Sequence, residues 1–264
     1  MRAFAFGSIL SLAALGSAAV AAPPRRVVSL NLCTDELLLA LAAPGQILSV
    51  THLSQQPAET PLWQAARRYP RNDGSLVSVA AMKPDLILTM GGGARDRGGI
   101  GARLGIRTID VPYPQTLSDL EAAIRTVAGA LGRQGAGEAL TARIASLKRS
   151  RSSRALDTLW LGGGGRTVPA QGLAAEWMAL AGLRQRAVSG DRVPLEQLVA
   201  RPPSVILRSD YRSGQYSSDQ RWLSHPLAHA ARRSRTIATD GRRWTCMGPT
   251  MIPEIERLKR EVGR

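Results

Sequence analysis

The sequence has few cysteines, histidines and phenylalanines. Its 264 residues include two cysteines, three histidines and two phenylalanines. A metal site built only from protein ligands needs several histidine or carboxylate side chains together, so His52, His225 and His229 give little support for one. The sequence also lacks a nucleophile elbow, and no Lys-Ser or Lys-Thr follows the glycines at 162–165 as it would in a phosphate-binding loop. These absences argue against hydrolases and NTPases.

Only one long apolar run is present, and it lies at the start of the chain. Arg2 precedes an apolar run from Ala3 to Val20, and Ala19-Val20-Ala21 fits the small-residue pattern of a signal-peptide cleavage site. We therefore predict that residues 1–22 are a secretory signal, cleaved near Ala21 or Ala22. A membrane anchor is the alternative, but the glycines and serines within the run disfavour it.

Acidic residues are outnumbered by basic ones. The chain has 35 lysines and arginines against 20 acidic residues, which gives a formal net charge of +15 and a pI near 11.3. Nearly all of the cations are arginines, and they are scattered along the chain. Nucleic acid is not an expected partner, because an exported chain rarely meets it and no base-stacking motif is present. The excess indicates an arginine-rich solvated surface or, alternatively, an anionic ligand.

Short apolar segments alternate with helical patterns in both halves of the chain. The predicted strands are 27–30, 47–50, 85–90 and 106–111 in the first half, and 158–161, 205–207 and 236–238 in the second. The main helical patterns around them are 35–41, 76–82, 174–181, 195–200 and 250–262. This alternation predicts parallel sheets with helices on both faces.

A long helical region separates the two halves. Apolar residues recur there at spacings of three and four in two runs, first Leu117, Leu120, Ile124, Val127 and Leu131, then Leu140, Ile144 and Leu147. The stretch Gly132–Gly137 interrupts the pattern. Two similar α/β halves joined by one helix are suited to holding a ligand between them.

Three segments carry a resemblance to a known family. They are Val27-Val28-Ser29-Leu30-Asn31-Leu32-Cys33-Thr34-Asp35-Glu36-Leu37, Met82-Lys83-Pro84-Asp85-Leu86-Ile87-Leu88 and Leu104-Gly105-Ile106. From Arg26 to Leu258 the chain resembles the periplasmic substrate-binding proteins of ABC importers for cobalamin and ferric siderophores. The resemblance implies an α/β fold with two Rossmann-like lobes, each with a parallel sheet, joined by one long interdomain helix. The implied division is 1–22 signal peptide, 23–133 N-terminal lobe, 134–154 bridging helix and 155–264 C-terminal lobe.

The resemblance also implies a function. The chain would be a periplasmic monomer that captures a metal chelate, a corrinoid such as cobalamin or a ferric siderophore, in the cleft between its lobes. It would need no cofactor of its own, and it would meet the membrane only through the permease of an ABC importer and, through that permease, the ATPase. An exported haem-binding protein or an enzyme on a related fold is the alternative.

Family members often carry one acidic residue on each lobe for contact with permease arginines. In the second lobe Glu196 matches that position, so the resemblance implies that it docks on the permease. The matching position in the first lobe is Val77, so half of the expected charge pair is missing there.

The loops after the strands should line the cleft, because ligands of such sheets bind outside the carboxyl ends of the strands. Tryptophan, tyrosine and arginine side chains in these loops suit a large, flat, partly anionic ligand. The predicted ligand-binding residues are Cys33, Thr34, His52, Gln56, Trp63, Gly92, Arg95, Arg166, Tyr211, Trp244 and Cys246.

The two cysteines leave three alternatives open. Cys33 follows the first strand and Cys246 follows the last, so both should face the cleft. They could form a disulfide between the lobes, contact the ligand as thiolates, or remain inert thiols. Export to an oxidising compartment favours the disulfide.

Overall fold

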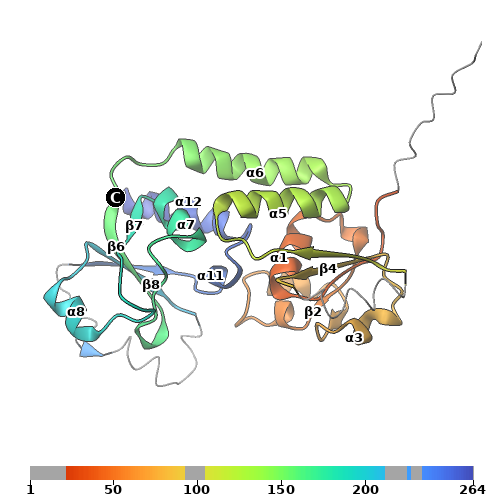
Figure 1. The fold of residues 1–264 in the computed structure, drawn as a ribbon, viewed down its shortest axis with the longest axis horizontal. Coiled ribbons are helices and arrows are strands. Elements are labelled where there is room, and N and C mark those ends of the chain that lie inside the picture. Colours follow the sequence, from red (N-terminus) through yellow and green to blue (C-terminus); the bar gives the residue numbers. More distant parts are fainter. Residues whose placement is uncertain (1–21, 93–104, 212–224, 227–233, 264) are drawn as a thin grey trace, which may run out of the picture.

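The computed structural model describes residues 22–92, 105–211, 225–226 and 234–263. Within these ranges the chain forms two parallel β-sheets that lie side by side, with a pair of long helices running along them (Figure 1). We call each sheet with its helices a lobe, the first from the earlier residues and the second from the later ones. None of the helices in this part of the chain has the length and apolar character needed to cross a membrane.

The first lobe is built on five parallel strands in the order β3-β2-β1-β4-β5. Alternate residues of its central strands pack on opposite faces, as the two-residue period of a strand requires. Val27 and Leu88 belong to the main core, whereas Val28 and Ile87 pack with Leu76 on the other face. The strands are β1 (Val27–Ser29), β2 (Ile47–Thr51), β3 (Arg71–Asn72), β4 (Leu86–Met90) and β5 (Arg107–Val111).

Short helices connect these strands. Their lengths are modest because each only returns the chain to the start of the next parallel strand. They are α1 (Leu32–Leu41), the 3-10 turns η1 (Pro44–Gln46) and η2 (Leu53–Gln55), α2 (Trp63–Ala66) and α3 (Leu76–Ala80).

The second lobe repeats the plan with four parallel strands in the order β7-β6-β8-β9. Leu159 and Ile206 pack with Leu198 on one face, and Leu207 and Ile237 join the main core on the other. The strands are β6 (Leu156–Leu161), β7 (Leu183–Gln185), β8 (Val205–Ser209) and β9 (Arg235–Thr239). The helical segments are η3 (Gly163–Gly165), α7 (Leu173–Leu180), α8 (Leu195–Ala200), α11 (Arg243–Cys246) and α12 (Met251–Val262).

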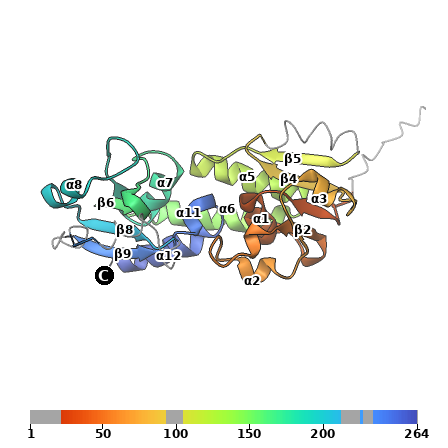
Figure 2. The ribbon, with the colours of Figure 1, turned by 90° about the horizontal axis from the view of Figure 1, so that it is seen from below.

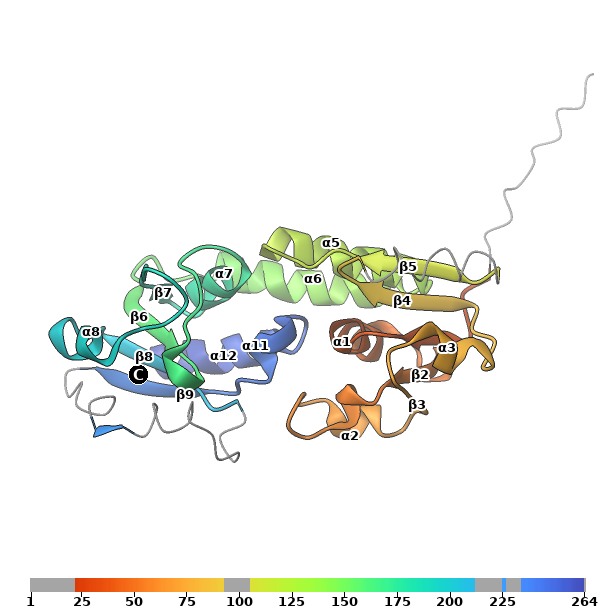
Figure 3. The same cartoon turned by 60° about the horizontal axis from the view of Figure 1, so that its bottom comes forward.

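The helices α5 (Leu117–Ala130) and α6 (Gln134–Arg149) form an antiparallel pair. The turn between them contains Gly132 at φ 66°, a backbone conformation that favours glycine. Gly137 lets the helices approach closely, since an added Cβ would lie 2.6 Å from the Cβ of Ala128. Figure 3 shows α6 extending from the first lobe to the second, where Arg143 pairs with Glu256 of α12 at 2.8 Å.

The start of α5 is held from both lobes. Thr116 and Asp119 form a capping box, in which each side chain accepts the backbone N–H of the other residue. Glu176 of α7 accepts a further bond from the N–H of Leu117 at 2.6 Å. A carboxylate at this position complements the positive end of the helix dipole, so the contact favours the observed placement of the second lobe on α5.

The predicted fold of two parallel α/β lobes is confirmed. Two strands were not predicted, β3 with two residues and β7 with three, because neither is an apolar run as β1 is. The helical break is also shorter than Gly132–Gly137, since α6 begins at Gln134.

Candidate functional site

A pocket of about 510 Å³ lies at the carboxyl end of the first sheet. Its volume is in the range of small-molecule sites, and its position outside the strand ends is where parallel sheets bind ligands. Four loops, those after β1, β2, β3 and β4, contribute its walls. The lining residues are Leu30, Asn31, Leu32, Thr51, His52, Leu53, Asp73, Gly74, Thr89, Met90, Gly91 and Gly92.

A second pocket of about 520 Å³ lies between α5, the end of α6 and α7. Leu117, Lys148 and Glu176 are among its lining residues. Because it is lined by helices and the loop before α7 rather than by strand ends, we take the pocket of the first sheet as the candidate ligand site.

The wall after β1 is fixed by the first residues of α1. Asn31 caps this helix, and its side-chain oxygen accepts the N–H of Cys33 at 2.8 Å. The hydroxyl of Thr34 lies 2.7 Å from that of Ser29 and donates to the carbonyl of Asn31 at 3.0 Å. Thr34 is fully buried, so we correct its prediction as a ligand contact: its hydroxyl holds the turn instead.

The wall after β2 is fixed by Asp35. Its buried carboxylate accepts the N–H of Thr51 at 3.1 Å and the hydroxyl of Thr51 at 2.5 Å. Burial raises the pKa of Asp35 to about 6, and the bonds from Thr51 oppose that rise. The contact joins α1 to the end of β2, directly before His52.

His52 and Gly92 are the two predicted ligand residues that line the pocket. The N–H of His52 donates to the carbonyl of Asn72 at 2.8 Å. The N–H of Gly92 donates to Asp110 of β5 at 2.8 Å. These bonds fix the backbone on both sides of the opening.

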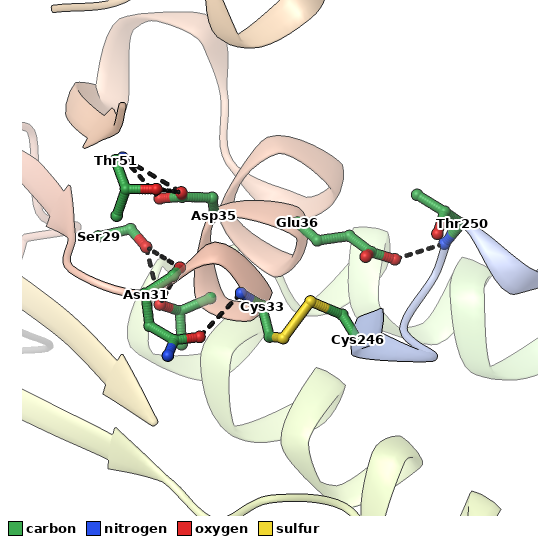
Figure 4. Close-up of a disulfide and its surroundings, with 9 residues drawn as sticks. Ser29, Asn31, Cys33, Asp35, Glu36, Thr51, Cys246 and Thr250 are labelled. Carbon is green, nitrogen blue, oxygen red and sulfur yellow. Dashed lines mark hydrogen bonds between the residues drawn. A yellow bond between two sulfur atoms is a disulfide. The ribbon is translucent and has the colours of Figure 1, made fainter. Parts of the chain in front are cut away.

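The predicted cysteine pair forms a disulfide between the lobes, with a Cα–Cα distance of 5.1 Å (Figure 4). Cys33 lies in the first turn of α1, and Cys246 ends α11, which lies beside α1 in Figures 1 and 2. Of the three alternatives, the disulfide is therefore the one that the structure shows. Ligand contact by free thiolates is excluded in this state.

A buried carboxylate lies next to the disulfide. Glu36 of α1 accepts the backbone N–H of Thr250 at 2.7 Å, across the junction between the lobes (Figure 4). An added Cβ at Gly248 would lie 2.8 Å from this carboxylate, so the glycine permits its approach. Burial raises the pKa of Glu36, while the N–H of Thr250 and the charge of Arg243 oppose the rise.

Two further contacts join the lobes. The hydroxyl of Tyr211, after β8, donates to Glu59 at 2.8 Å, and Arg242, after β9, donates to the carbonyl of Pro57 at 2.8 Å. Glu59 and Pro57 follow β2 in the same loop region as His52. Tyr211 therefore lies at the lobe junction and does not line the pocket, and its predicted ligand contact stays a prediction.

A comparison with known families identifies the chain. The sequence profile of the family described as periplasmic binding protein matches residues 27–242, which is more than half of the chain. The chain belongs to the periplasmic binding protein family.

Solved structures share this fold. The periplasmic haem-binding protein HutB of Vibrio cholerae is 17% identical with a TM-score of 0.70, over 90% of this chain and 98% of that one. The vitamin B12-binding protein BtuF of Vibrio cholerae is 18% identical with a TM-score of 0.63, over 90% and 96%. The haem-binding protein RhuT of Roseiflexus sp. RS-1 is 22% identical with a TM-score of 0.67, over 89% and 96%. At these identities the similarity establishes the fold alone. No curated protein matches the sequence.

Family membership confirms the resemblance recognised in the sequence. The family that matches is one of binding proteins. The pocket at the strand ends of the first lobe is therefore interpreted as a binding site, and its residues need no catalytic role.

Trp244 requires a correction. Its side chain is 7% exposed, its indole N–H donates to Thr239 at 2.8 Å, and its ring lies 5.9 Å from that of Trp160. The ring is part of the core of the periplasmic binding protein because α11, which follows β9, packs this side chain back onto the sheet. It presents no face to a ligand in this state.

The remaining predicted residues lie outside the pocket lining. Gln56 is exposed, and Trp63 is partly buried with the guanidinium of Arg67 4.7 Å from its ring centre. Arg166 is exposed in the second lobe and pairs with Asp191 at 3.3 Å. Arg95 lies outside the described residues. Ligand contact by these four stays a prediction.

Several lining residues were missed by the sequence reasoning. Asp73 and Gly74 follow β3, which was too short to recognise, and Leu53 and Met90 are apolar residues without a chemical signature. The rule that strand ends meet at one edge would have found Asp73 once β3 was known.

The disulfide predicts a large loss of stability in a cysteine-free variant. The double change Cys33→Ser and Cys246→Ser should lower the free energy of unfolding by about 3–5 kcal/mol, because the bond closes a loop with a sequence separation of 213 residues. Denaturant unfolding measures the difference. Reductant should destabilise the wild type and leave the variant unchanged. Two readily alkylated thiols in protein purified without reductant would contradict the disulfide.

Proposed function

We propose that this periplasmic binding protein captures a metal chelate in the pocket of its first lobe and delivers it to an ABC importer. The chelate is a corrinoid such as cobalamin or a ferric siderophore, and haem is a second candidate. The observation that carries the proposal is the pocket of about 510 Å³ at the strand ends, in a chain of this family. The metal arrives inside the chelate, so the proposal requires no resident cofactor.

The pocket walls combine apolar and polar surface, and the polar surface is the larger part. Leu30, Leu32, Leu53 and Met90 supply apolar area, whereas His52 and Asp73 supply polar groups. Binding sites for organic ligands combine such walls with a few placed polar contacts, which set orientation. Haem is included because HutB and RhuT, which share the fold, are haem-binding proteins.

Leu53→Arg tests the pocket. Leu53 lines it and is 39% exposed, so the longer charged side chain should enter the pocket without disturbing the core. We expect affinity for the chelate to fall at least tenfold. Calorimetric titrations measure the change in affinity. The ligands are cyanocobalamin, ferric protoporphyrin IX, and ferric catecholate and hydroxamate siderophores.

Val199→Arg is the matched control for that experiment. Val199 is also a partly exposed aliphatic residue, at 49%, but it lies on α8 and does not line the pocket. Its substitution should leave the affinity unchanged. Equal affinities of the Leu53 variant and the wild type would place the ligand elsewhere.

We also propose that Glu196 docks on the permease, with the importer's ATPase reached through that permease. Glu196 is exposed on α8, and Val77, at the corresponding place on α3, is 85% exposed. Figure 1 shows α3 and α8 in different lobes, toward the side of the molecule away from α6. One acid and one apolar side chain are thus available to the partner. The proposal takes the binding protein to act as a monomer, without nucleic acid as a partner.

Charge reversal at Glu196 tests the docking. Glu196→Lys should abolish ligand-stimulated transport in reconstituted vesicles while leaving chelate affinity intact, because the residue lies outside the pocket. Glu138→Lys is the control, since Glu138 is exposed on α6. Undiminished transport by the Glu196 variant would show that this acid is an ordinary surface charge.

Export of the chain is the last part of the proposal. Residues 1–21 lie outside the described range, and the apolar run with its small residues supports cleavage near Ala21 or Ala22. The intact mass of protein purified from the periplasm should correspond to a chain that starts at Ala22 or Pro23. A mass that includes the first twenty residues would contradict cleavage.

A further inference from the structure

The disulfide between the lobes lies at the edge of the core. Cys33 and Cys246 are both partly exposed, and Cys33 packs against the buried residues of the main core from outside. The bond joins the first turn of α1 to the end of α11, separately from the chain connection through α6. Thiol–disulfide exchange requires that a thiolate reach one of the two sulfurs. A disulfide at the edge of the core permits that approach.

The position of Cys33 favours its release as a thiolate. Cys33 is the second residue of a helix of ten residues, and its N–H donates to the capping side chain of Asn31 at 2.8 Å. The positive end of the helix dipole stabilises a thiolate at this place. A stabilised thiolate is the better leaving group in disulfide exchange, so attack on the sulfur of Cys246 is the favoured direction.

The carboxylates of the same turn are engaged with partners of their own. Asp35 accepts the N–H and the hydroxyl of Thr51 in the first lobe. Glu36 accepts the N–H of Thr250, and burial raises the pKa of its carboxyl while the charge of Arg243 opposes the rise. These contacts weaken the repulsion that either carboxylate exerts on a thiolate. The positive end of α1 therefore remains the main influence on Cys33.

The residue after Cys246 has a strained backbone. Met247 has φ 51° and ψ 31°, in the left-handed region that residues other than glycine rarely adopt. The disulfide holds the chain directly before Met247, and the carbonyl of Met247 accepts the indole N–H of Trp177 at 2.9 Å. Breaking the disulfide removes one of these two restraints. The end of α11, which lies beside α1 in Figures 1 and 2, can then relax.

The contacts that remain at the junction are weaker than the disulfide. Among the described residues they include the hydrogen bonds of Glu36 with Thr250 and of Tyr211 with Glu59. Hydrogen bonds break and reform on their own, whereas a disulfide opens only by chemical reaction. The bond therefore limits how far the lobes separate at this point, and its redox state decides whether that limit applies.

We propose that the disulfide between Cys33 and Cys246 is a redox control of lobe opening, reduced by a protein with a dithiol site. The proposal rests on the proposed function for export and chelate capture, and it concerns the exchange of the chelate rather than its recognition.

The reduction proceeds in two steps. A thiolate of the dithiol attacks Sγ of Cys246, the bond to Sγ of Cys33 breaks, and its electron pair stays on Cys33. The second thiolate of the dithiol then attacks its own partner sulfur in the mixed disulfide and releases Cys246. The dithiol is oxidised to a disulfide, two electrons pass to the cysteine pair, and the two protons of the dithiol are taken up by the two cysteine thiolates.

Reduction of the native protein is the first test. The purified mature protein is incubated with reduced thioredoxin as the dithiol probe, without denaturant, and its thiols are alkylated and counted by intact mass. We expect both cysteines to be alkylated. A thioredoxin variant without its second active-site cysteine should be trapped on Cys246, as peptide mass spectrometry would show. A disulfide that is reduced only after denaturant is added would overturn the inference, and trapping on Cys33 would overturn the assigned attack.

Hydrogen exchange measures the opening that follows. Backbone exchange in residues 32–41 and 243–250, on the two sides of the junction, should be at least tenfold faster in the reduced protein than in the oxidised one. Exchange in β8 should be unchanged, which distinguishes opening from unfolding. The double variant Cys33→Ser and Cys246→Ser is the control, and it should match the reduced wild type with or without reductant. Equal exchange of oxidised and reduced wild type at the junction would contradict the control of opening.

Stopped-flow absorbance measures the consequence for the chelate. The probes are ferric protoporphyrin IX, cyanocobalamin and a ferric hydroxamate siderophore. For a probe that binds, association and dissociation should both be at least fivefold faster after reduction, because the lobes move more freely while the pocket is unaltered. Unchanged rates would overturn the link between the disulfide and chelate exchange. If no probe bound in either redox state, the proposed function would fail, and hydrogen exchange at the junction would still decide the redox control.

Discussion

The first turn of α1 makes contacts in three directions, and both the lobe junction and the pocket depend on them. Cys33 is bonded to Cys246 in the second lobe, and the next two residues point into the first lobe, where Thr34 meets Ser29 and Asp35 meets Thr51. Glu36 then reaches Thr250 in the second lobe (Figure 4). Successive residues of a helix point about 100° apart, so a single turn can reach all of these partners. A change of register here would therefore disturb both lobes.

Two covalent connections join the lobes, the chain through α6 and the disulfide at α1. A single helix between lobes already permits only modest opening, and a second tether removes further freedom. Other contacts at the junction, among them those of Glu36 with Thr250, Tyr211 with Glu59 and Arg242 with Pro57, are hydrogen bonds and can break and reform. In the oxidised protein, opening of the lobes to admit a ligand must therefore leave the disulfide intact and break these hydrogen bonds.

Much of the fold could be predicted from the sequence because its strands are apolar runs placed between helical patterns. The cysteine pair was favoured by reasoning from the compartment, and His52 and Gly92 were reached by the rule that strand ends meet at one edge. Trp244 could not be placed in the same way, because the sequence pattern shows neither the short helix α11 nor that its tryptophan packs on Trp160 rather than facing the ligand. Asp73 was missed because β3 has two residues, and pairing with β2 rather than periodicity defines it.

The large positive charge of the chain says little about the ligand. Many of its arginines bind carbonyl groups where segments end: Arg26 donates to Met82, Arg257 to Ala238 and Arg243 to Thr250. A guanidinium with five donors can satisfy such carbonyls and a carboxylate together, as Arg257 does with Glu254 at 2.7 Å. These arginines therefore have structural roles in joining segments of the chain. The electrostatic field at the ligand is set by nearby charges. In the pocket lining the charged side chain that accompanies His52 is the carboxylate of Asp73, which directly follows β3.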